Sequence, residues 1–251
     1  MSVLEISDLT ARHGLLTAVR GVSFSVAPGE VVALVGANGA GKSTLLRSIA
    51  GAHQDQGGRV TLKGEDLTGC DAHKRVQRGL ALVPEGRKLF SQMNVWENLC
   101  LGAQVGRPGD WTPERVFDVF DNLQKRRYSA CTHLSGGEQQ AVAIGRALVS
   151  NPDVIMLDEV SLGLSPAIVD RVYAVLPELR ASGTGVIVVE QDLGRAMSVA
   201  DRVICMLEGE IVLEGRADSL SREEIIGAYF GLPPGAQGSE DHTNPAIGVM
   251  T

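Results

Sequence analysis

The chain has 251 residues, of which 44% are hydrophobic and 21% are charged, and its formal net charge is −7. This composition is ordinary for a globular protein and is sufficient for one large domain, or for a core domain with a small subdomain. The acidic balance argues against non-specific binding of nucleic acid, which needs a basic surface, so we expect no nucleic-acid partner.

The N-terminal third of the chain consists of short β-rich runs around a glycine-rich loop. The run VVALVG (31–36) is continuously apolar, which is typical of a strand buried on both faces. After the loop, KSTLLRSIAG (42–51) predicts a helix with Gly51 as its C-cap. The other runs that predict strands are VLEIS (3–7), GVSFSV (21–26), the first part of GRVTLKGEDL (58–67) and LALVP (80–84).

From about residue 85 to residue 150 the pattern changes to one typical of helices. In the last of these helices Ala141, Ile144 and Leu148 fall on one face, as expected for a helix that packs on a core. The runs that predict helices are NVWENLCLGA (94–103), TPERVFDVFDNLQ (112–124) and GGEQQAVAIGRALVS (136–150).

Strands and helices alternate in the remainder of the chain. The runs that predict strands are DVIMLDE (153–159), TGVIVVEQ (184–191) and RVICML (202–207), and helical stretches separate them at 166–181 and 193–200. This alternation predicts an α/β fold with a mostly parallel sheet covered on both faces. We predict a core formed by residues 1–84 and 151–230, a helical subdomain at 85–150, and a disordered tail at 231–251 that is rich in Gly, Pro and polar residues.

The cysteines and the N-terminal sequence indicate the cellular compartment in which we expect the protein. Cys70, Cys100, Cys131 and Cys205 form no C-x-x-C pair, and the histidines show no metal-ligand spacing, so we interpret the cysteines as isolated thiols in a reducing compartment. MSVLEISDLT lacks the basic-then-apolar pattern of a signal peptide, and the longest apolar runs are too short to span a bilayer. We expect a cytoplasmic protein that only another subunit could hold at a membrane.

The stretch GANGAGKST (36–44) is a complete phosphate-binding loop that follows a strand and opens a helix. Glycines allow the backbone N–H groups to turn toward phosphates, and the helix N-terminus adds partial positive charge. We expect Lys42 to reach the β and γ phosphates and Ser43 to ligate Mg²⁺. The predicted binding set is Gly36, Ala37, Asn38, Gly39, Ala40, Gly41, Lys42, Ser43 and Thr44.

The run VIMLDE (154–159) is an apolar strand that ends in two carboxylates. Asp158 is placed to hold Mg²⁺, directly or through its water, and Glu159 is placed to polarise an attacking water as the general base. A strand that ends in Asp-Glu is common by itself. Its occurrence together with the phosphate loop favours the catalytic interpretation.

The stretch LSGGEQQ (134–140) suggests a second anion site. Ser135 and the N–H groups of Gly136 and Gly137 stand at the N-terminus of a predicted helix, where the helix dipole favours negative charge. Ser135 followed by Glu138 also fits an ordinary capping box, and both interpretations can hold together.

The phosphate loop, LSGGEQQ and the Asp-Glu strand, in this order, resemble the nucleotide-binding subunit of ABC transporters over about residues 3–230. The resemblance implies a phosphate-loop (RecA-like) core with an antiparallel β subdomain at the N-terminus, a helical insert, and hydrolysis of ATP with Mg²⁺. It also implies that two cassettes pack head to tail. Ser135, Gly136 and Gly137 then serve the ATP of the partner, and residues 36–44 hold the chain's own nucleotide.

Within this family, LVPEGRKLFSQMNVWENL (82–99), LSGGEQQAVAIGRAL (134–148) and SLGLSP (161–166) resemble the LivF-type ATPases of branched-chain amino acid importers. The ATPases of urea and short-chain amide importers are nearly identical to these. The resemblance implies a second, non-identical ATPase subunit, transmembrane permease subunits and, indirectly, a substrate-binding protein, at the cytoplasmic side of the inner membrane. A soluble ABC ATPase that acts on nucleic acid or the ribosome is the alternative, but the single cassette without sustained heptads disfavours it.

Four positions depart from the general pattern of the family. His13 stands where an aromatic residue stacks on adenine, and Glu85 stands where glutamine is usual in the loop between core and helical insert. Val160 stands where proline is usual, and Gln191 replaces a histidine that contacts the γ-phosphate. Glu85 and Gln191 fit the LivF-type subfamily. We expect His13 and Glu85 at the nucleotide, and Gln191 as a neutral and weaker hydrogen-bond donor to the γ-phosphate.

Overall fold

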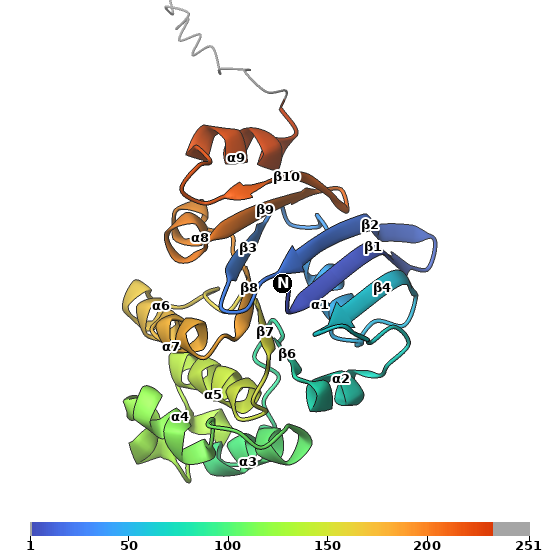
Figure 1. Ribbon diagram of the computed structural model, residues 1–251. Coiled ribbons are helices and arrows are strands. Elements are labelled where there is room, and N and C mark those ends of the chain that lie inside the picture. The colour runs from blue at the N-terminus through green and yellow to red at the C-terminus, as the bar shows by residue number, and fades with distance from the viewer. Residues whose placement is uncertain (1, 233–251) are drawn as a thin grey trace, which may run out of the picture.

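The computed structural model describes residues 2–232 (Figure 1). Its centre is a six-stranded sheet with the spatial order β10-β9-β3-β8-β7-β6. Neighbouring strands run parallel except β10, which lies antiparallel to β9 at one edge. The predicted α/β fold with a mostly parallel sheet is confirmed. The strands are β3 (Val31–Val35), β6 (Leu80–Val83), β7 (Val154–Asp158), β8 (Gly185–Val189), β9 (Arg202–Leu207) and β10 (Glu210–Arg216).

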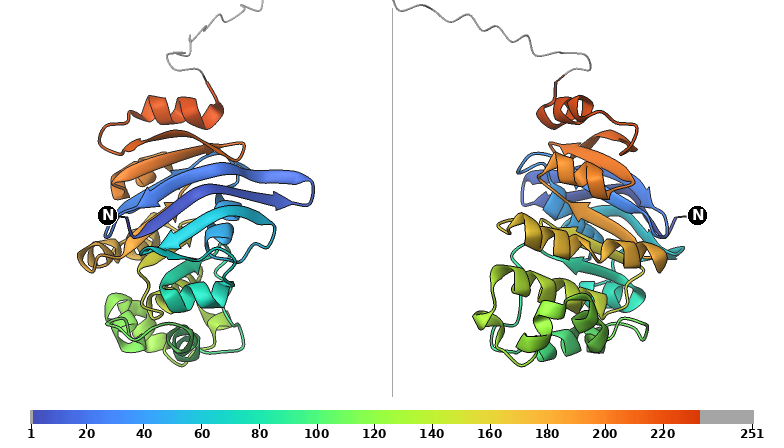
Figure 2. Two further views of the ribbon diagram at one scale, coloured as in Figure 1. Left: turned by 45° about the vertical axis from the view of Figure 1, so that its right-hand side comes forward. Right: turned by 90° about the vertical axis from the view of Figure 1, so that its left-hand side faces the viewer.

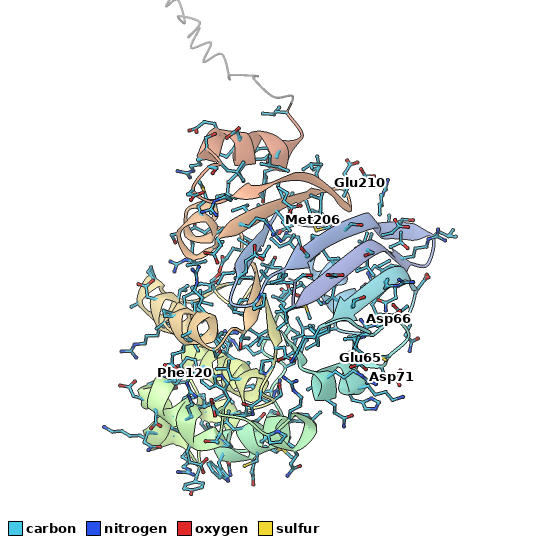
Figure 3. The ribbon with its side chains drawn as sticks, viewed as in Figure 1. Glu65, Asp66, Asp71, Phe120, Met206 and Glu210 are labelled. Atoms are coloured by element: carbon cyan, nitrogen blue, oxygen red, sulfur yellow. The ribbon has the colours of Figure 1, made fainter. Side chains whose placement is uncertain are left out.

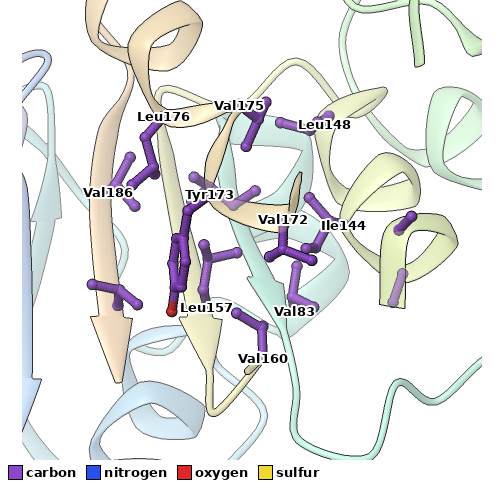
Figure 4. Close-up of a cluster of buried hydrophobic side chains, with 14 of the residues drawn as sticks. Val83, Ile144, Leu148, Leu157, Val160, Val172, Tyr173, Val175, Leu176 and Val186 are labelled. Carbon is purple, nitrogen blue, oxygen red and sulfur yellow. The ribbon is translucent and has the colours of Figure 1, made fainter. Parts of the chain in front are cut away.

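The central strands are apolar throughout because both faces of the sheet are covered. Every residue of β3, β7 and β8 is buried. Alternate side chains of β3 enter two separate cores, since successive residues of a strand point to opposite faces. Val31, Ala33 and Val35 pack in the core on the helix side, part of which Figure 4 shows, and Val32 and Leu34 pack in the core on the opposite side.

That opposite face is covered by a second sheet and one helix. The second sheet is antiparallel, with the spatial order β2-β1-β4-β5. Helix α1 (Lys42–Ile49) lies in the same layer, and its Leu45, Leu46 and Ile49 share a core with Val32 and Leu34 of β3. The strands of the second sheet are β1 (Leu4–His13), β2 (Leu16–Val26), β4 (Gln56–Leu62) and β5 (Glu65–Asp66).

Helices cover the other face, and those from the middle of the chain gather at one end of the molecule, opposite α9 (Figure 2). Helix α5 packs on α3, α4 and α6 and on strand β6. Within residues 2–232, no helix combines the length and the apolar character that a bilayer span requires. The remaining helices are α2 (Ala72–Arg78), α3 (Val95–Val105), α4 (Pro113–Val119), α5 (Gly136–Leu148), α6 (Pro166–Tyr173), α7 (Leu176–Ala181), α8 (Leu193–Val199), α9 (Arg222–Phe230) and the 3₁₀ helices η1 (Asp121–Arg126) and η2 (Cys131–His133).

Two stretches predicted as single helices are interrupted. The run 112–124 forms α4 and then η1, because Phe120 leaves the helical conformation at φ −112° and ψ 71° and its ring is buried in the core (labelled in Figure 3). The run 166–181 divides into α6 and α7. Pro177 explains this division, because it has no N–H to donate to Tyr173 and its ring crowds the preceding turn.

Strand β10 and helix α9 were not predicted. Helix α9 begins with a capping box, in which the N–H of Glu224 donates to the hydroxyl of Ser221 at 3.2 Å and the N–H of Ser221 donates to the Glu224 carboxylate at 2.8 Å. The pattern Ser-x-x-Glu was therefore the signal that could have revealed this helix.

The predicted disordered tail begins inside the cap of α9. Gly231 has a left-handed φ of 66°, and the N–H of Leu232 donates to the carbonyl of Gly227 at 2.8 Å. The first two residues of the predicted tail thus complete the helix end, which corrects that boundary. Residues 233–251 lie outside the described residues.

The arginine at position 75 connects α2 to α1. Arg75 is fully buried, and its guanidinium donates to the carbonyls of Cys70 at 3.0 Å, Ser48 at 3.1 Å and Ile49 at 2.6 Å. The last two carbonyls belong to the final turn of α1, where the carbonyl groups lack helical partners and the helix dipole favours a cation. Burial lowers the pKa of this guanidinium. Arg75 therefore holds the C-terminal end of the helix that follows the phosphate loop.

We expect Arg75→Met to lower the free energy of unfolding by about 2–4 kcal/mol, because it removes the hydrogen bonds of a buried guanidinium to three carbonyls. Arg78→Met, on the same helix, is the matched control. It removes an exposed ion pair with Glu65 and should cost about 0–1 kcal/mol. Urea unfolding followed by circular dichroism measures both values, and equal losses would contradict this role for Arg75.

Candidate functional site

The phosphate loop connects β3 to α1 and is enclosed by backbone on both sides. At Gly36, with a φ of 148°, a Cβ atom would lie 2.3 Å from the carbonyl oxygen of Met206 (labelled in Figure 3). At Gly41, with a φ of 99°, a Cβ atom would lie 2.3 Å from the carbonyl oxygen of Ala18. Only glycine fits these two positions, so the close packing against β9 and β2 explains the residue types of the motif.

Lys42 lies inside this loop. Its side chain is 4% exposed, and its ammonium donates to the carbonyls of Gly36 at 2.7 Å and Ala37 at 3.0 Å. Burial lowers the pKa of Lys42, while the carboxylates of Glu159 and Asp158 act in the opposite direction. The loop therefore folds around a cation, which suits a site for phosphate groups.

Asp158 at the end of β7 meets the beginning of α1. The hydroxyl of Ser43 donates to Asp158 Oδ1 at 3.0 Å, and Asp158 is fully buried. Its second oxygen, Oδ2, has no hydrogen-bond partner within residues 2–232. Burial raises the pKa of this carboxyl, with Glu159 and Glu85 acting in the same direction and the bond from Ser43 opposing them. A buried carboxylate oxygen without a partner is unfavourable unless a cation or donor meets it.

The oxygen atoms of Ser43 and Asp158 are of the kind that Mg²⁺ prefers, and Oδ2, which has no partner among the described residues, is available for such an ion or for its water. Within residues 2–232, no group of three or more His, Cys, Asp or Glu side chains is arranged to hold a metal. A Mg²⁺ ion at this site would therefore take its other oxygen ligands from water and from a nucleotide. The residues present fit that requirement.

Glu159 and Gln191 contact each other directly. The amide Nε2 of Gln191 donates to Oε2 of Glu159 at 2.7 Å. The pairing of Asp158 with Val189 in the β7–β8 ladder explains this contact, because Glu159 and Gln191 follow closely on the paired strand ends. Glu159 also has a left-handed φ of 49°, which is unusual for a residue other than glycine. The sequence predicted both residues at the site but did not predict this hydrogen bond.

His13 and Glu85 lie at the borders of this region. The Nε2 atom of His13, at the end of β1, is 3.2 Å from the hydroxyl oxygen of Thr44 in the phosphate loop. The ring of His13 packs edge-on against that of His53, with centroids 4.7 Å apart, and His53 was not predicted. Glu85 is exposed in the loop after β6 and is close enough to raise the pKa of Asp158.

The stretch LSGGEQQ begins helix α5. The N–H of Glu138 donates to the Ser135 hydroxyl at 3.3 Å and the N–H of Ser135 donates to the Glu138 carboxylate at 2.8 Å, so the predicted capping box is present. At Gly137 a Cβ atom would meet the side chain of Ile168 at 2.5 Å. The buried residues of α5 belong to the core on the helix side, whereas those of α1 belong to the opposite core. The two predicted anion sites of the chain are therefore in different layers of the fold.

The loop that contains Glu85 is attached to α5. The guanidinium of Arg87 donates to Gln139 Oε1 at 2.9 Å, and that of Arg146 donates to the carbonyl of Lys88 at 2.8 Å. Neither Arg87 nor Arg146 was predicted from the sequence. Their contacts connect the loop after β6 with the helix that begins at Ser135.

Residues 19–161 match the ABC transporter family model. The chain is 38% identical over 232 residues to the high-affinity branched-chain amino acid transport ATP-binding protein BraG of Pseudomonas aeruginosa, covering 91% of this chain and 100% of that protein. It is 30% identical to the lipopolysaccharide export system ATP-binding protein LptB of Haemophilus influenzae, covering 90% of this chain and 95% of that protein. The solved ATP-binding cassette MJ1267 of an ABC transporter has a TM-score of 0.79 at 29% identity, covering 91% of this chain and 99% of that one.

We expect Gly41→Ala to lower the free energy of unfolding by about 3–4 kcal/mol, because the added Cβ would overlap the carbonyl oxygen of Ala18. Gly39→Ala is the matched control in the same loop. Its φ of 86° is also left-handed, but a Cβ there meets no atom within 4 Å, so only the backbone cost of about 1–2 kcal/mol applies. Denaturant unfolding without nucleotide compares the two, and equal losses would show that the contact with β2 does not constrain the loop.

Proposed function

Since the chain belongs to the ABC transporter family and is one of its ATP-hydrolysing subunits, we propose that it powers an importer of branched-chain amino acids. The similarity to BraG, which extends over the whole of that protein, supports this substrate class. LptB is similar over nearly the same length and is named for lipopolysaccharide export, so one type of cassette serves different cargoes. Urea and short-chain amides are the alternative cargoes, because the ATPases of their importers resemble this chain closely.

The phosphate loop is the proposed site for the chain's own ATP. Backbone N–H groups of residues 36–44 and the buried ammonium of Lys42 bind the phosphates, and His13 packs on the adenine. Ser43 and Asp158 would hold Mg²⁺, with Glu85 at the edge of the same site. The ion would supply positive charge that offsets the negative charge of the phosphates.

Glu159 is the proposed general base. Its carboxylate accepts a proton from the attacking water, and Gln191 keeps that carboxylate in place by donating its amide hydrogen. This hydrogen bond adds a role for Gln191, which is to position the carboxylate of Glu159. The contact of Gln191 with the γ-phosphate, which the resemblance implies, stays a prediction. The single observation that best supports a metal-nucleotide site is Oδ2 of buried Asp158, which lies beside Ser43 and has no partner in the described part of the chain.

Ser135, Gly136 and Gly137 are proposed to bind the ATP of a second cassette, which the resemblance implies is non-identical. The separation of α5 and α1 into two layers supports this arrangement, since the motif then has no role at the chain's own phosphate loop. Nucleotide at such an interface would join the two cassettes, and hydrolysis would release them.

A groove beside the Glu85 loop is the proposed docking site for a permease subunit. It has a volume of about 250 Å³ and is lined mainly by apolar side chains of α3, α5 and the loop after β6. Phe90 and Val105 are 53% and 41% exposed there. An apolar segment of a membrane subunit would cover these side chains, and the contacts of Arg87 and Arg146 would transmit its movement to α5. The chain would then be peripheral, at the cytoplasmic side of the inner membrane, with a substrate-binding protein as an indirect partner.

We expect Glu159→Gln to keep ATP binding and to lower turnover by at least about 100-fold, because an amide cannot accept the proton of the attacking water. Glu208→Gln is the matched control, since Glu208 has the same left-handed φ of 49° but is exposed in the turn between β9 and β10. Phosphate release and binding of a fluorescent ATP analogue are measured in the assembled complex. Wild-type turnover in Glu159→Gln would remove Glu159 from the role of base.

The transport proposal is tested by co-expression with the permease subunits and by ATPase assays after reconstitution with the binding protein. We expect leucine, isoleucine or valine to stimulate ATP hydrolysis, whereas urea and acetamide should not. Phe90→Asp should abolish co-purification with the permease and keep ATP binding. Phe230→Asp, which changes a 67% exposed aromatic residue on α9, should affect neither. Stimulation by urea or acetamide alone would overturn the proposed cargo, and unchanged co-purification of Phe90→Asp would overturn the docking site.

A further inference from the structure

A buried carboxylate lies directly beside Gln191, and the chemistry described above does not use it. Glu190 follows strand β8 and is 1% exposed. The hydroxyl of Ser161 donates to its Oε2 at 2.9 Å, and the hydroxyl of Tyr173 donates to its Oε1. Figure 4 shows the Tyr173 side chain with its hydroxyl toward the end of β7, near Leu157 and Val160. Three segments therefore meet at this carboxylate: the end of β8, the loop after β7, and helix α6.

The two hydroxyl groups stabilise the charge of Glu190. Within residues 2–232, Glu190 forms no ion pair with a Lys, Arg or His side chain. The nearby guanidinium of Arg195 pairs instead with Asp170 at 3.2 Å and lies 5.9 Å from the centroid of the Tyr173 ring. Hydrogen bonds to an ionised acceptor are roughly twice as strong as neutral ones, and a buried carboxylate without donors is costly. This arrangement therefore strongly favours one position of the Ser161 loop relative to β8.

The same two segments also carry the proposed catalytic contact. Ser161 is two residues after Glu159, and Glu190 directly precedes Gln191. The loop from Glu159 to Ser161 is thus joined to residues 190–191 by two hydrogen bonds, one from Ser161 to Glu190 and one from Gln191 to Glu159. The left-handed φ of Glu159 is an unfavourable conformation that its surroundings must hold in place.

We propose that Glu190 is a positioning residue for ATP hydrolysis. Through its hydrogen bonds to Ser161 and Tyr173, Glu190 fixes the position of the loop after β7. The carboxylate of Glu159 then keeps its hydrogen bond to the amide of Gln191. This inference rests on the proposed role of Glu159 as the base. Glu190 does not touch the reacting atoms, so its loss should lower kcat and should leave the KM for ATP nearly unchanged.

The first test removes only the hydroxyl group of Tyr173. We expect Tyr173→Phe to lower kcat about three- to tenfold, with the KM for ATP changed by less than about twofold, because one hydrogen bond to the carboxylate is lost. Tyr128→Phe, at a tyrosine that is 74% exposed in the helical region, is the matched control and should have wild-type kinetics. Glu190→Ala should lower kcat further, and Glu190→Gln should restore part of it, because an amide can still bond to both hydroxyls.

A double-mutant cycle then separates positioning from a purely structural role. If Glu190 acts through the contact between Glu159 and Gln191, Tyr173→Phe should cost less than about twofold in kcat when Gln191→Ala is already present. Full additivity of the two substitutions would overturn the inference. So would a Tyr173→Phe variant that loses thermal stability but keeps the wild-type kcat.

The Glu159→Gln variant distinguishes failure of this inference from failure of the proposed function. Wild-type turnover in Glu159→Gln would show that the base itself is misassigned, and the positioning role would fall with it. An inactive Glu159→Gln variant, combined with wild-type kcat in both Tyr173→Phe and Glu190→Gln, would overturn only the role of Glu190.

Discussion

The adjacent parallel strands β3, β8 and β7 carry most of the candidate site, because they end at the same edge of the sheet. Strand β3 leads into the phosphate loop, β7 ends at Asp158 and Glu159, and β8 is followed by Glu190 and Gln191. All three strands are buried on both faces, so apolar packing holds their register. A shift of β7 by one residue would turn its side chains to the opposite faces and would separate Asp158 from Ser43.

The charged groups of this region differ in what compensates for their loss of hydration. Lys42, Asp158 and Glu190 are all almost inaccessible to solvent, but each has different hydrogen-bond partners. The ammonium of Lys42 donates to two loop carbonyls, and both oxygens of Glu190 accept bonds from hydroxyl groups. Asp158 has one oxygen bonded to Ser43 and one that meets no partner among residues 2–232. A buried polar group whose hydrogen bonds are all made holds its neighbours rigidly. A buried polar atom without a hydrogen bond is a place where a bound ligand gains the most binding free energy.

Helices α1 and α5 lie in different layers of the fold and are attached to different parts of the molecule. Helix α1 is joined to the second sheet and held at its C-terminal end by Arg75, so the phosphate loop belongs to a rigid unit. Helix α5 is joined through Arg87 and Arg146 to the loop after β6, next to the apolar groove. The loop beside the groove is therefore attached directly to the helix that begins at Ser135, whereas Lys42 belongs to the other layer.

Local patterns in the sequence determined most of the strands and helices and the phosphate loop, because periodicity and motif spacing are properties of neighbouring residues. They failed where a side chain's surroundings decided the outcome, as at Phe120, whose buried ring accompanies the end of α4. They also could not reveal that Gln191 donates to Glu159, or that Ser161 and Tyr173 meet at Glu190. These partners are far apart in the chain, and only the order β3-β8-β7 brings them together. That order results from the packing of both sheet faces, and no single stretch of sequence contains it.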